Sequence, residues 1–144
     1  MAGTSTIEAR KRELIEELNL LPPGEERLLQ LLNIGRKYPA MDDALKTDDR
    51  LLPGCVSRLW IQEELVDGHL VFHMDADAAI SKGIAAAVLG LYNHQPPDAI
   101  LAVEPDFFAQ TGLDGLISPN RSNAVASLRK FLATTARKYL PDGR

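Results

Sequence analysis

The sequence predicts an α+β fold in which a small antiparallel sheet is packed by helices. Three observations predict it: helical periodicity up to Tyr38, an Asp67-Gly68 turn between two alternating apolar segments, and renewed helical periodicity from Ile80 to Tyr139. An alternating βαβα pattern is absent, so a parallel sheet is not expected. With 144 residues, 45% of them hydrophobic, the chain has the size of one domain spanning residues 1–144.

Two helices are expected before the sheet. Ser5 and Glu8 have the spacing of a capping box, and the apolar stripe that follows predicts a helix to about Asn19. Pro22-Pro23-Gly24 interrupts the pattern. A second helix with acidic residues in its first turn should then end near Tyr38, because Pro39 follows.

The segment from Pro39 to about Val56 has no sustained periodicity and is rich in Asp. Irregular segments longer than about 12–15 residues inside compact domains are usually functional or disordered. This one ends in Leu51-Leu52-Pro53-Gly54-Cys55, which contains the only cysteine of the chain. We therefore expect a functional loop here.

A β-hairpin should follow, because Asp-Gly tolerates the positive φ angles of a tight turn. Counting outward from Asp67-Gly68 brings most of the apolar residues onto one face. The predicted pairs are Leu65 with Leu70, Glu63 with Phe72, and Ile61 with Met74. We also expect a third short strand, which the sequence itself does not show.

Helices should complete the chain. Asp75 or Asp77 is a suitable N-cap for a central helix, and Pro96-Pro97 starts a short helix over residues 99–103, followed by a turn at 105–110. The final helix should begin after Ser118-Pro119. The apolar stripes of the two long helices are Ile80, Ile84, Ala87, Val88 and Leu91, and Val125, Leu128, Leu132, Ala136 and Tyr139.

Charge and composition limit the classes of function. Lys and Arg number 16 against 20 for Asp and Glu, and the net charge of −4 argues against non-specific nucleic-acid binding. No stretch reaches the roughly 20 apolar residues of a transmembrane helix, and the N-terminus has no apolar signal region. We expect a cytoplasmic protein, monomeric or weakly dimeric, whose partner is a protein or a small molecule.

Cys55 is the residue most able to carry chemistry. A single cysteine forms no internal disulfide and supplies too few thiolates for a metal cluster. It is either a small apolar side chain at the foot of the first strand or a reactive thiol. Gly54, which lacks a Cβ, lets the backbone bend and another chain approach the thiol. His69, His73 and His94 have no spacing that indicates a metal site.

Three segments of the chain carry distinctive motifs: Gly54-Cys55-Val56-Ser57-Arg58-Leu59-Trp60, Asp75-Ala76-Asp77-Ala78-Ala79-Ile80-Ser81-Lys82-Gly83 and Ser118-Pro119-Asn120-Arg121-Ser122. Together, in this order and spacing, they resemble the SufE/CsdE family of sulfur acceptors. The resemblance runs from about Thr6 to Tyr139. Val56, Arg58 and Asn123-Ala124 depart from the family pattern, which leaves the choice of partner open.

The resemblance implies a protein that stimulates a pyridoxal-phosphate cysteine desulfurase, accepts its persulfide sulfur on Cys55, and delivers it to an iron–sulfur cluster scaffold or another acceptor. It also implies a fold similar to IscU-type scaffolds, with a three-stranded sheet. The pyridoxal phosphate belongs to the desulfurase, so no cofactor is expected in this chain. The protein would act as a co-substrate rather than as a stand-alone enzyme.

The resemblance also indicates residues that support the loop or contact the partner: Gly54, Ser57, Asp77, Lys82 and Arg121. Asp77 could instead be a simple N-cap and Lys82 a solvated side chain. The Arg121 guanidinium could pair with a carboxylate of the partner, steady the Cys55 thiolate, or lie on the surface at a helix start.

Persulfide transfer requires a thiolate that attacks the outer sulfur of a bound persulfide. An exposed persulfide would be lost to small thiols, so we expect the loop from Leu51 to Cys55 to shelter the sulfur until docking. Three other hypotheses compete with this one: a cluster scaffold, which needs several thiolates; a cysteine hydrolase using Cys55, His73 and an Asp; and a non-catalytic adaptor with Cys55 inert.

Overall fold

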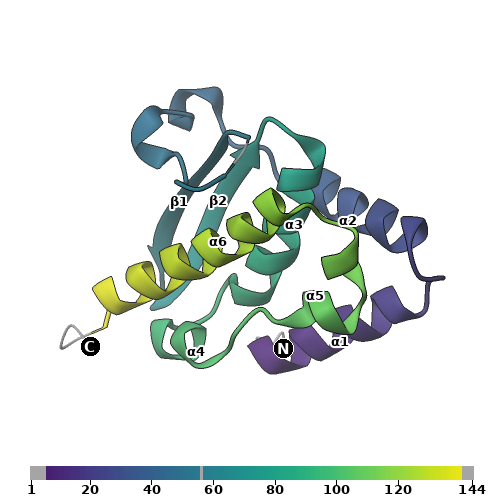
Figure 1. The fold of residues 1–144 in the computed structure, drawn as a ribbon. Coiled ribbons are helices and arrows are strands. Elements are labelled where there is room, and N and C mark those ends of the chain that lie inside the picture. Colours follow the sequence, from purple (N-terminus) through teal and green to yellow (C-terminus); the bar gives the residue numbers. More distant parts are fainter. Residues whose placement is uncertain (1–5, 56, 141–144) are drawn as a thin grey trace.

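The fold is a two-stranded hairpin packed by helices on one face (Figure 1). The structure, a computed structural model, describes residues 6–55 and 57–140, with the side chains of residues 120 and 121 left out. The helices are α1 (Ile7–Asn19), α2 (Glu25–Lys37), α3 (Ala79–Tyr92), α4 (Pro97–Ala102), α5 (Phe107–Gln110) and α6 (Pro119–Lys138), and the strands are β1 (Leu59–Val66) and β2 (His69–Ala76). The α+β prediction is confirmed.

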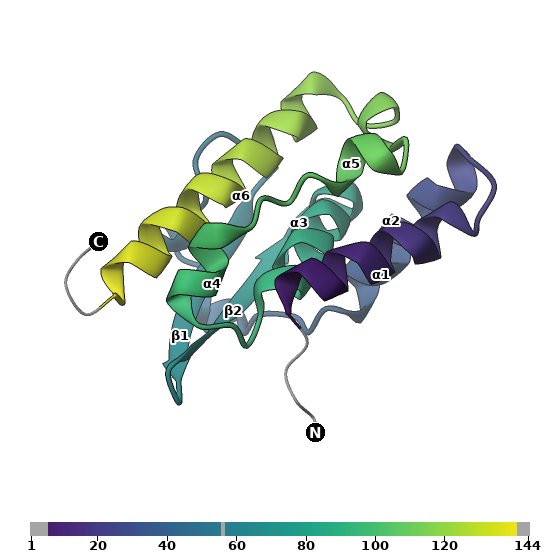
Figure 2. The same ribbon diagram turned by 90° about the horizontal axis from the view of Figure 1, so that it is seen from below.

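Helix α3 lies between the hairpin and the pair formed by α1 and α2 (Figure 2). Its sequence is apolar on nearly every side, and its residues from Gly83 to Leu89 are all buried. A helix that is hydrophobic all round is stable only when it is covered on all sides. The hairpin, α6 and the first two helices supply that cover, which makes α3 the centre of the core.

The first two helices end where the sequence predicted, at Asn19 and Lys37. The capping residue of α1 differs: the Thr6 hydroxyl accepts the hydrogen bond from the Ala9 amide at 3.0 Å. Ser5, which we expected to be the cap, lies outside the described residues. Thr6 has extended backbone angles and stands directly before the first helical residue, so it fulfils the same requirement one position later.

The hairpin has the predicted register, with Leu65 opposite Leu70, Glu63 opposite Phe72 and Ile61 opposite Met74. Asp67 and Gly68 both take positive φ angles, 52° and 79°. The two-residue turn fixes this pairing, and the buried face follows from it. Leu65 is the exception on that face, since it is 48% exposed near the turn.

The expected third strand is wrong for the part of the chain that the structure describes, where the sheet has two strands. Beside the hairpin, Leu51 forms a single antiparallel bridge with Trp60. Pairing stops after Leu52, whose amide donates to the Leu59 carbonyl at 2.8 Å. Pro53 has no amide to donate, and Gly54 turns the chain with φ of +87°. The segment before Cys55 therefore adds one bridged residue pair, and no strand, to the edge of β1.

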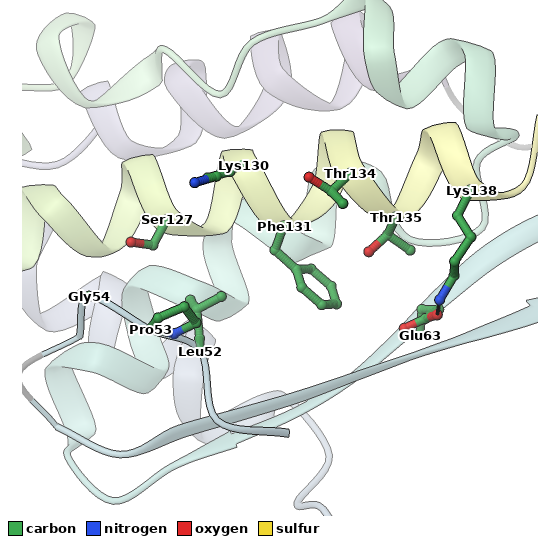
Figure 3. Close-up of a pocket in the computed structure, with 10 residues that line it drawn as sticks. All are labelled: Leu52, Pro53, Gly54, Glu63, Ser127, Lys130, Phe131, Thr134, Thr135 and Lys138. Carbon is green, nitrogen blue, oxygen red and sulfur yellow. Dashed lines mark hydrogen bonds and ion pairs between the residues drawn. The ribbon is translucent and has the colours of Figure 1, made fainter. Parts of the chain in front are cut away.

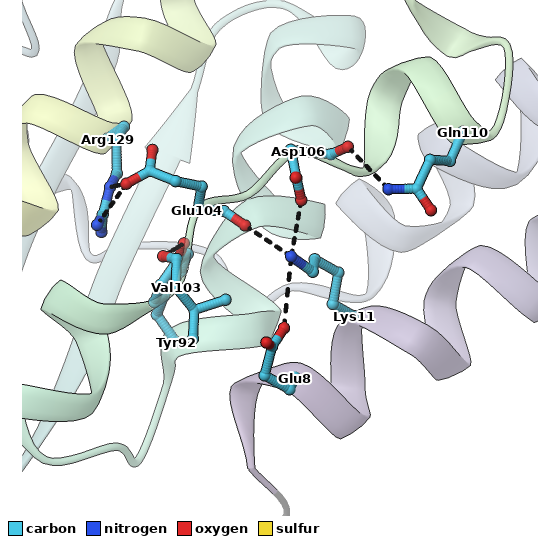
Figure 4. A network of polar contacts seen from close by, with 8 residues as sticks. All are labelled: Glu8, Lys11, Tyr92, Val103, Glu104, Asp106, Gln110 and Arg129. Atoms are coloured by element: carbon cyan, nitrogen blue, oxygen red, sulfur yellow. Dashed lines mark hydrogen bonds and ion pairs between the residues drawn. The ribbon is translucent and has the colours of Figure 1, made fainter.

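The connection between α4 and α5 is held by polar contacts from three sides (Figure 4). Lys11 of α1 donates to the Glu104 carbonyl at 3.1 Å and pairs with Asp106 at 2.7 Å. Arg129 of α6 pairs with the Glu104 carboxylate at 2.8 Å, and the Tyr92 hydroxyl donates to the Val103 carbonyl at 2.6 Å. These contacts tie the first, third and last helices together.

Among the described residues, no helix has the length and apolarity to cross a bilayer.

Candidate functional site

Cys55 lies on a tight turn between the Leu51–Trp60 bridge and the start of β1. We call residues 51–55 and 57–58 the Cys55 loop. Gly54 precedes the cysteine with φ of +87°, and a Cβ added there would lie 2.5 Å from the Ser127 hydroxyl oxygen of α6. The loop therefore turns back against α6 at the residue before the thiol. The sharp bend that the sequence predicted at Gly54 is present, with a positive φ that favours glycine.

The Cys55 side chain is half-buried and packs against the hydrophobic core. Burial raises the pKa of the Cys55 thiol, and no charge among the described side chains offsets this effect. The group is therefore mainly the neutral thiol near neutral pH. A sulfur atom at this position is sheltered on one side and still borders solvent. Its burial thus lies between that of an apolar core side chain and that of a freely accessible thiol.

The chain after Cys55 is held by Asp77. The Arg58 amide donates to the Asp77 carboxylate at 2.9 Å, and the Asp77 amide donates back to the Arg58 carbonyl at 3.0 Å. Asp77 is therefore not the N-cap of α3; that position is Ala78, which makes no side-chain cap. Of the two roles that the sequence left open for Asp77, the structure thus shows support of the loop and not the cap of α3.

Ser57 adds a second attachment between the Cys55 loop and α3. Its hydroxyl is hydrogen-bonded to that of Ser81 at 2.6 Å. Ser81 is buried in the first turn of α3, so the contact anchors the loop to the best-packed helix of the molecule. Ser57 and Asp77, two of the residues that the sequence predicted to support the loop, thus make separate contacts at the same end of it.

Lys82 acts through a carboxylate that the sequence did not identify as a site residue. Its ammonium lies 3.3 Å from Asp75, and Lys46 reaches the same carboxylate at 3.2 Å. Asp75 also accepts hydrogen bonds from the Met41 and Ala76 amides at 3.1 and 2.9 Å. We call these residues the Asp75 network. The alternation along β2 places Asp75 on the less apolar face of the hairpin. It is buried there because the segment that contains Met41 and Lys46 packs against it.

Neighbouring groups stabilise the negative charge of Asp75, although its side chain is only 8% exposed. Burial by itself raises the pKa of Asp75, but the two amides and the two ammonium groups outweigh it and hold that pKa below the ordinary value of 3.8. The network joins β2 and α3 to the irregular segment that leads into the Cys55 loop. It therefore helps to fix the loop from upstream.

Arg50 makes the last attachment upstream of the loop. The segment that contains it forms two short 3₁₀ turns, Asp43–Leu45 and Asp48–Arg50. The Arg50 side chain donates to the Gln62 side chain at 2.8 Å and to the Leu45 carbonyl at 3.2 Å. The segment without periodicity in the sequence is thus held against β1 by the hydrogen bond from the Arg50 guanidinium to Gln62.

A cavity of about 550 Å³ lies between the Cys55 loop, β1 and α6 (Figure 3). We call it the α6 cavity. The residues that line it are Leu52, Pro53, Gly54, Glu63, Ser127, Lys130, Phe131, Thr134, Thr135 and Lys138. Three consecutive loop residues before Cys55 therefore form one of its walls. Sequence reasoning missed this cavity, because its walls come from segments more than 60 residues apart.

Arg121 belongs to the first turn of α6, but its side chain lies outside the described residues. His73 lies opposite Gln62, as predicted, and its imidazole is 2.8 Å from Glu64. The described residues contain no cluster of three or more His, Cys, Asp or Glu side chains placed to hold a metal ion. The geometry thus provides one thiol, with no imidazole partner among the contacts found for it.

Comparison with known proteins agrees with this architecture. Residues 12–136 match the family model described as SufE, Fe-S metabolism associated domain. An uncharacterized SufE-like protein of Synechocystis is 30% identical over 134 residues, covering 93% of this chain and 84% of that protein. The SufE-like protein 1, chloroplastic/mitochondrial, of Arabidopsis thaliana is 26% identical over 126 residues; the match covers 87% of this chain but only 34% of that protein.

A solved structure has the same fold. The solution structure of a hypothetical protein from Thermus thermophilus superposes with a TM-score of 0.72, covering 90% of this chain and 95% of that one. Only 21% of the residues are identical, so this likeness concerns the arrangement of helices and strands.

Proposed function

The chain belongs to the SufE family of Fe-S metabolism associated domains, and from that premise we propose that it is a sulfur acceptor. In this proposal Cys55 takes a persulfide sulfur from a cysteine desulfurase, the protein stimulates that enzyme, and the sulfur passes to an iron–sulfur cluster scaffold or another acceptor. The observation that carries the proposal is a lone, half-buried thiol on a turn that is anchored on both sides.

The transfer step requires only one thiol in this chain. The Cys55 thiolate attacks the outer sulfur of the donor persulfide, a new S–S bond forms on Cys55, and the donor cysteine leaves as a thiolate. No net oxidation occurs. A second cysteine nearby would attack the product and discharge it as a disulfide, and the chain contains none. The half-burial of Cys55 would shelter the persulfide between its two partners.

The raised pKa of Cys55 means that the free protein is a weak nucleophile. The desulfurase must therefore move the loop or bring a positive charge to it. Hydrogen exchange of the amides from Arg50 to Ser57 measures such a movement. We expect faster exchange when the desulfurase is added, and unchanged exchange would contradict loop opening.

The remaining roles follow from the same chemistry. Pyridoxal phosphate would stay on the desulfurase, and this chain would serve as its co-substrate with no cofactor of its own. We place the reaction in the cytoplasm, where free thiols stay reduced, and expect a monomer or weak homodimer. A non-catalytic adaptor is the second candidate, and it differs in having no use for the thiol.

Replacement of Cys55 by Ser separates the two candidates. Mixed with a desulfurase and free cysteine, the wild-type protein should gain the mass of sulfur atoms in an intact-protein spectrum. The Cys55→Ser variant should gain none and should lose stimulation of the enzyme. If the variant still stimulates fully, the adaptor is correct and the carrier is wrong.

A relocated thiol serves as the matched control. Ser122 is exposed on α6, so a Cys55→Ser, Ser122→Cys variant has one accessible thiol outside the loop. This variant should take up no sulfur, because transfer depends on the loop rather than on a free thiol alone. Uptake equal to that of the wild type would contradict the role of position 55.

A further inference from the structure

The α6 cavity has the size and lining of a small-molecule site. Its volume of about 550 Å³ lies within the range of roughly 300–1,000 Å³ that is typical of ligand pockets. Leu52, Pro53 and Phe131 give it an apolar lining, and Figure 3 shows Phe131 projecting from α6 toward the strands. Such pockets bind apolar groups and select them through a few polar contacts.

One polar side chain inside the cavity has no partner. Thr135 is only 5% exposed, and its hydroxyl makes no hydrogen bond to the residues that the structure describes. Thr111 shows the usual alternative, since its hydroxyl donates to the Phe107 carbonyl one turn earlier at 3.0 Å. Figure 3 places the Thr135 oxygen on the cavity side of α6. Because an unpaired buried hydroxyl is costly, this group is available for a ligand.

The charges around the cavity favour an anion. At one end, Lys138 lies 2.7 Å from the Glu63 carboxylate, and the Tyr139 hydroxyl donates to the same carboxylate at 3.1 Å. That pair is neutral as a unit. Lys130, which also lines the cavity, has no ion pair among the described residues. The cavity therefore has one uncompensated positive charge, which a carboxylate would neutralise.

We propose that the α6 cavity binds a small organic carboxylate with an apolar body. The carboxylate pairs with Lys130, the apolar body packs on Phe131 and Leu52, and a polar atom of the ligand hydrogen-bonds to the Thr135 hydroxyl. Leu52, Pro53 and Gly54 form the opposite wall, so a bound ligand restrains the residues directly before Cys55. The consequence for sulfur transfer rests on the proposed function, whereas binding itself does not.

Titration of the full chain with 3-phenylpropanoate, followed by ¹⁵N NMR, tests the site. Saturable shift changes are expected at Leu52, Gly54 and Thr135, and the neutral 3-phenylpropanamide should bind more weakly. Lys130→Gln should raise the Kd about 2- to 5-fold, the range of an exposed ion pair. Thr135→Val, which keeps the side-chain shape, should raise it about 2- to 10-fold, the range of one hydrogen bond.

Lys37 on α2 provides the matched control, because it is exposed and does not line the cavity. Lys37→Gln should leave the Kd unchanged. Absence of saturable shifts at the cavity residues, or equal affinity for the carboxylate and the amide, would overturn the proposal. So would equal effects of Lys130→Gln and Lys37→Gln.

The effect on the loop has its own measurement. Alkylation of Cys55 by iodoacetamide should slow as 3-phenylpropanoate saturates the cavity. An unchanged rate at saturation would overturn the restraint of the loop. Neither experiment uses a desulfurase, so a failure of sulfur transfer in the mass-spectrometric assay would leave both results standing.

Discussion

The crossing of α2 and α3 and the Cys55 loop both depend on glycine, but for opposite physical reasons. At the crossing, a Cβ on Gly35 would lie 2.7 Å from the Gly83 nitrogen, and a Cβ on Gly83 would lie 2.7 Å from the Leu31 carbonyl oxygen. Both neighbours are backbone atoms that cannot move aside. At the loop, a Cβ on Gly54 would meet only the rotatable hydroxyl of Ser127.

The comparison distinguishes a region fixed by backbone contact from one fixed by side-chain contacts. The crossing is fixed by backbone contact at the centre of the core, whereas the loop is attached through side chains: Ser57 to Ser81, and Asp77 to the Arg58 amide. Regions held by few contacts open at a lower free energy than the core. This difference suits the proposed function, in which the thiol is sheltered and then presented to a partner.

Gly83→Ala should have the largest effect and tests the rigid side of the comparison. The added Cβ would push α2 from α3 and lower the free energy of unfolding by about 3 kcal/mol, the upper range of overpacking. Urea denaturation measures it. Gly90→Ala, also in α3, is the control, because a Cβ there meets nothing within 4 Å; it should be neutral or stabilising by up to about 1 kcal/mol. Equal effects would contradict the backbone contact.

Asp75→Asn should have the next largest effect, because it removes the charge that Lys46 and Lys82 share. The expected loss in the free energy of unfolding is about 2 kcal/mol, as for hydrogen bonds to a buried charge. Asp48→Asn, at an exposed position on a 3₁₀ turn, is the control and should change little.

The pH dependence gives this prediction a sign. Since the pKa of Asp75 in the folded protein lies below the ordinary 3.8, the unfolded chain takes up the proton first as pH falls. The stabilisation is therefore complete above the unfolded-state value and is lost as pH falls below about 4. Urea midpoints measured from pH 6 to pH 3 should fall less steeply in Asp75→Asn than in the wild type. Parallel curves would contradict the assignment.

Gly54→Ala tests the mobile side. A positive φ costs a non-glycine residue about 1–2 kcal/mol, and the Ser127 hydroxyl must also rotate away. Gly112→Ala is the matched control, because Gly112 has φ of +74° with open space around its Cβ position. We expect the two variants to differ by less than about 1 kcal/mol in urea denaturation, with the rate of Cys55 alkylation altered only in Gly54→Ala. A loss as large as that of Gly83→Ala would make the loop as rigid as the crossing.

The smallest effect concerns the thiol itself and leaves the fold intact. Because burial raises the pKa of Cys55 above the ordinary value of 9.0, the rate of iodoacetamide alkylation should still be rising with pH at that value. In denaturing urea the profile should move to lower pH. A native profile that saturates below pH 9 would show that the loop exposes the thiol in the free protein.

Much of the fold was predictable because it depends on local patterns. The Asp67-Gly68 turn alone sets the hairpin register, and the Pro residues after α1 and α2 end those helices where expected. The rest depended on which of two partners a residue finds in the folded chain. Asp77 could cap α3 or support the loop, and the structure shows that its carboxylate accepts from the Arg58 amide. The third strand, whose position the sequence did not indicate, is absent from the described residues.

By itself, the sequence determined the class of fold, the hairpin register and the identity of the single thiol. Each of these follows from residue type and short-range spacing, which backbone geometry translates directly into structure. Only the tertiary structure decided that Asp75 is a buried hub, that Cys55 is half-sheltered, and that the α6 cavity exists. These features join segments far apart in the chain, and whether a polar group is buried or paired depends on which distant segment packs against it.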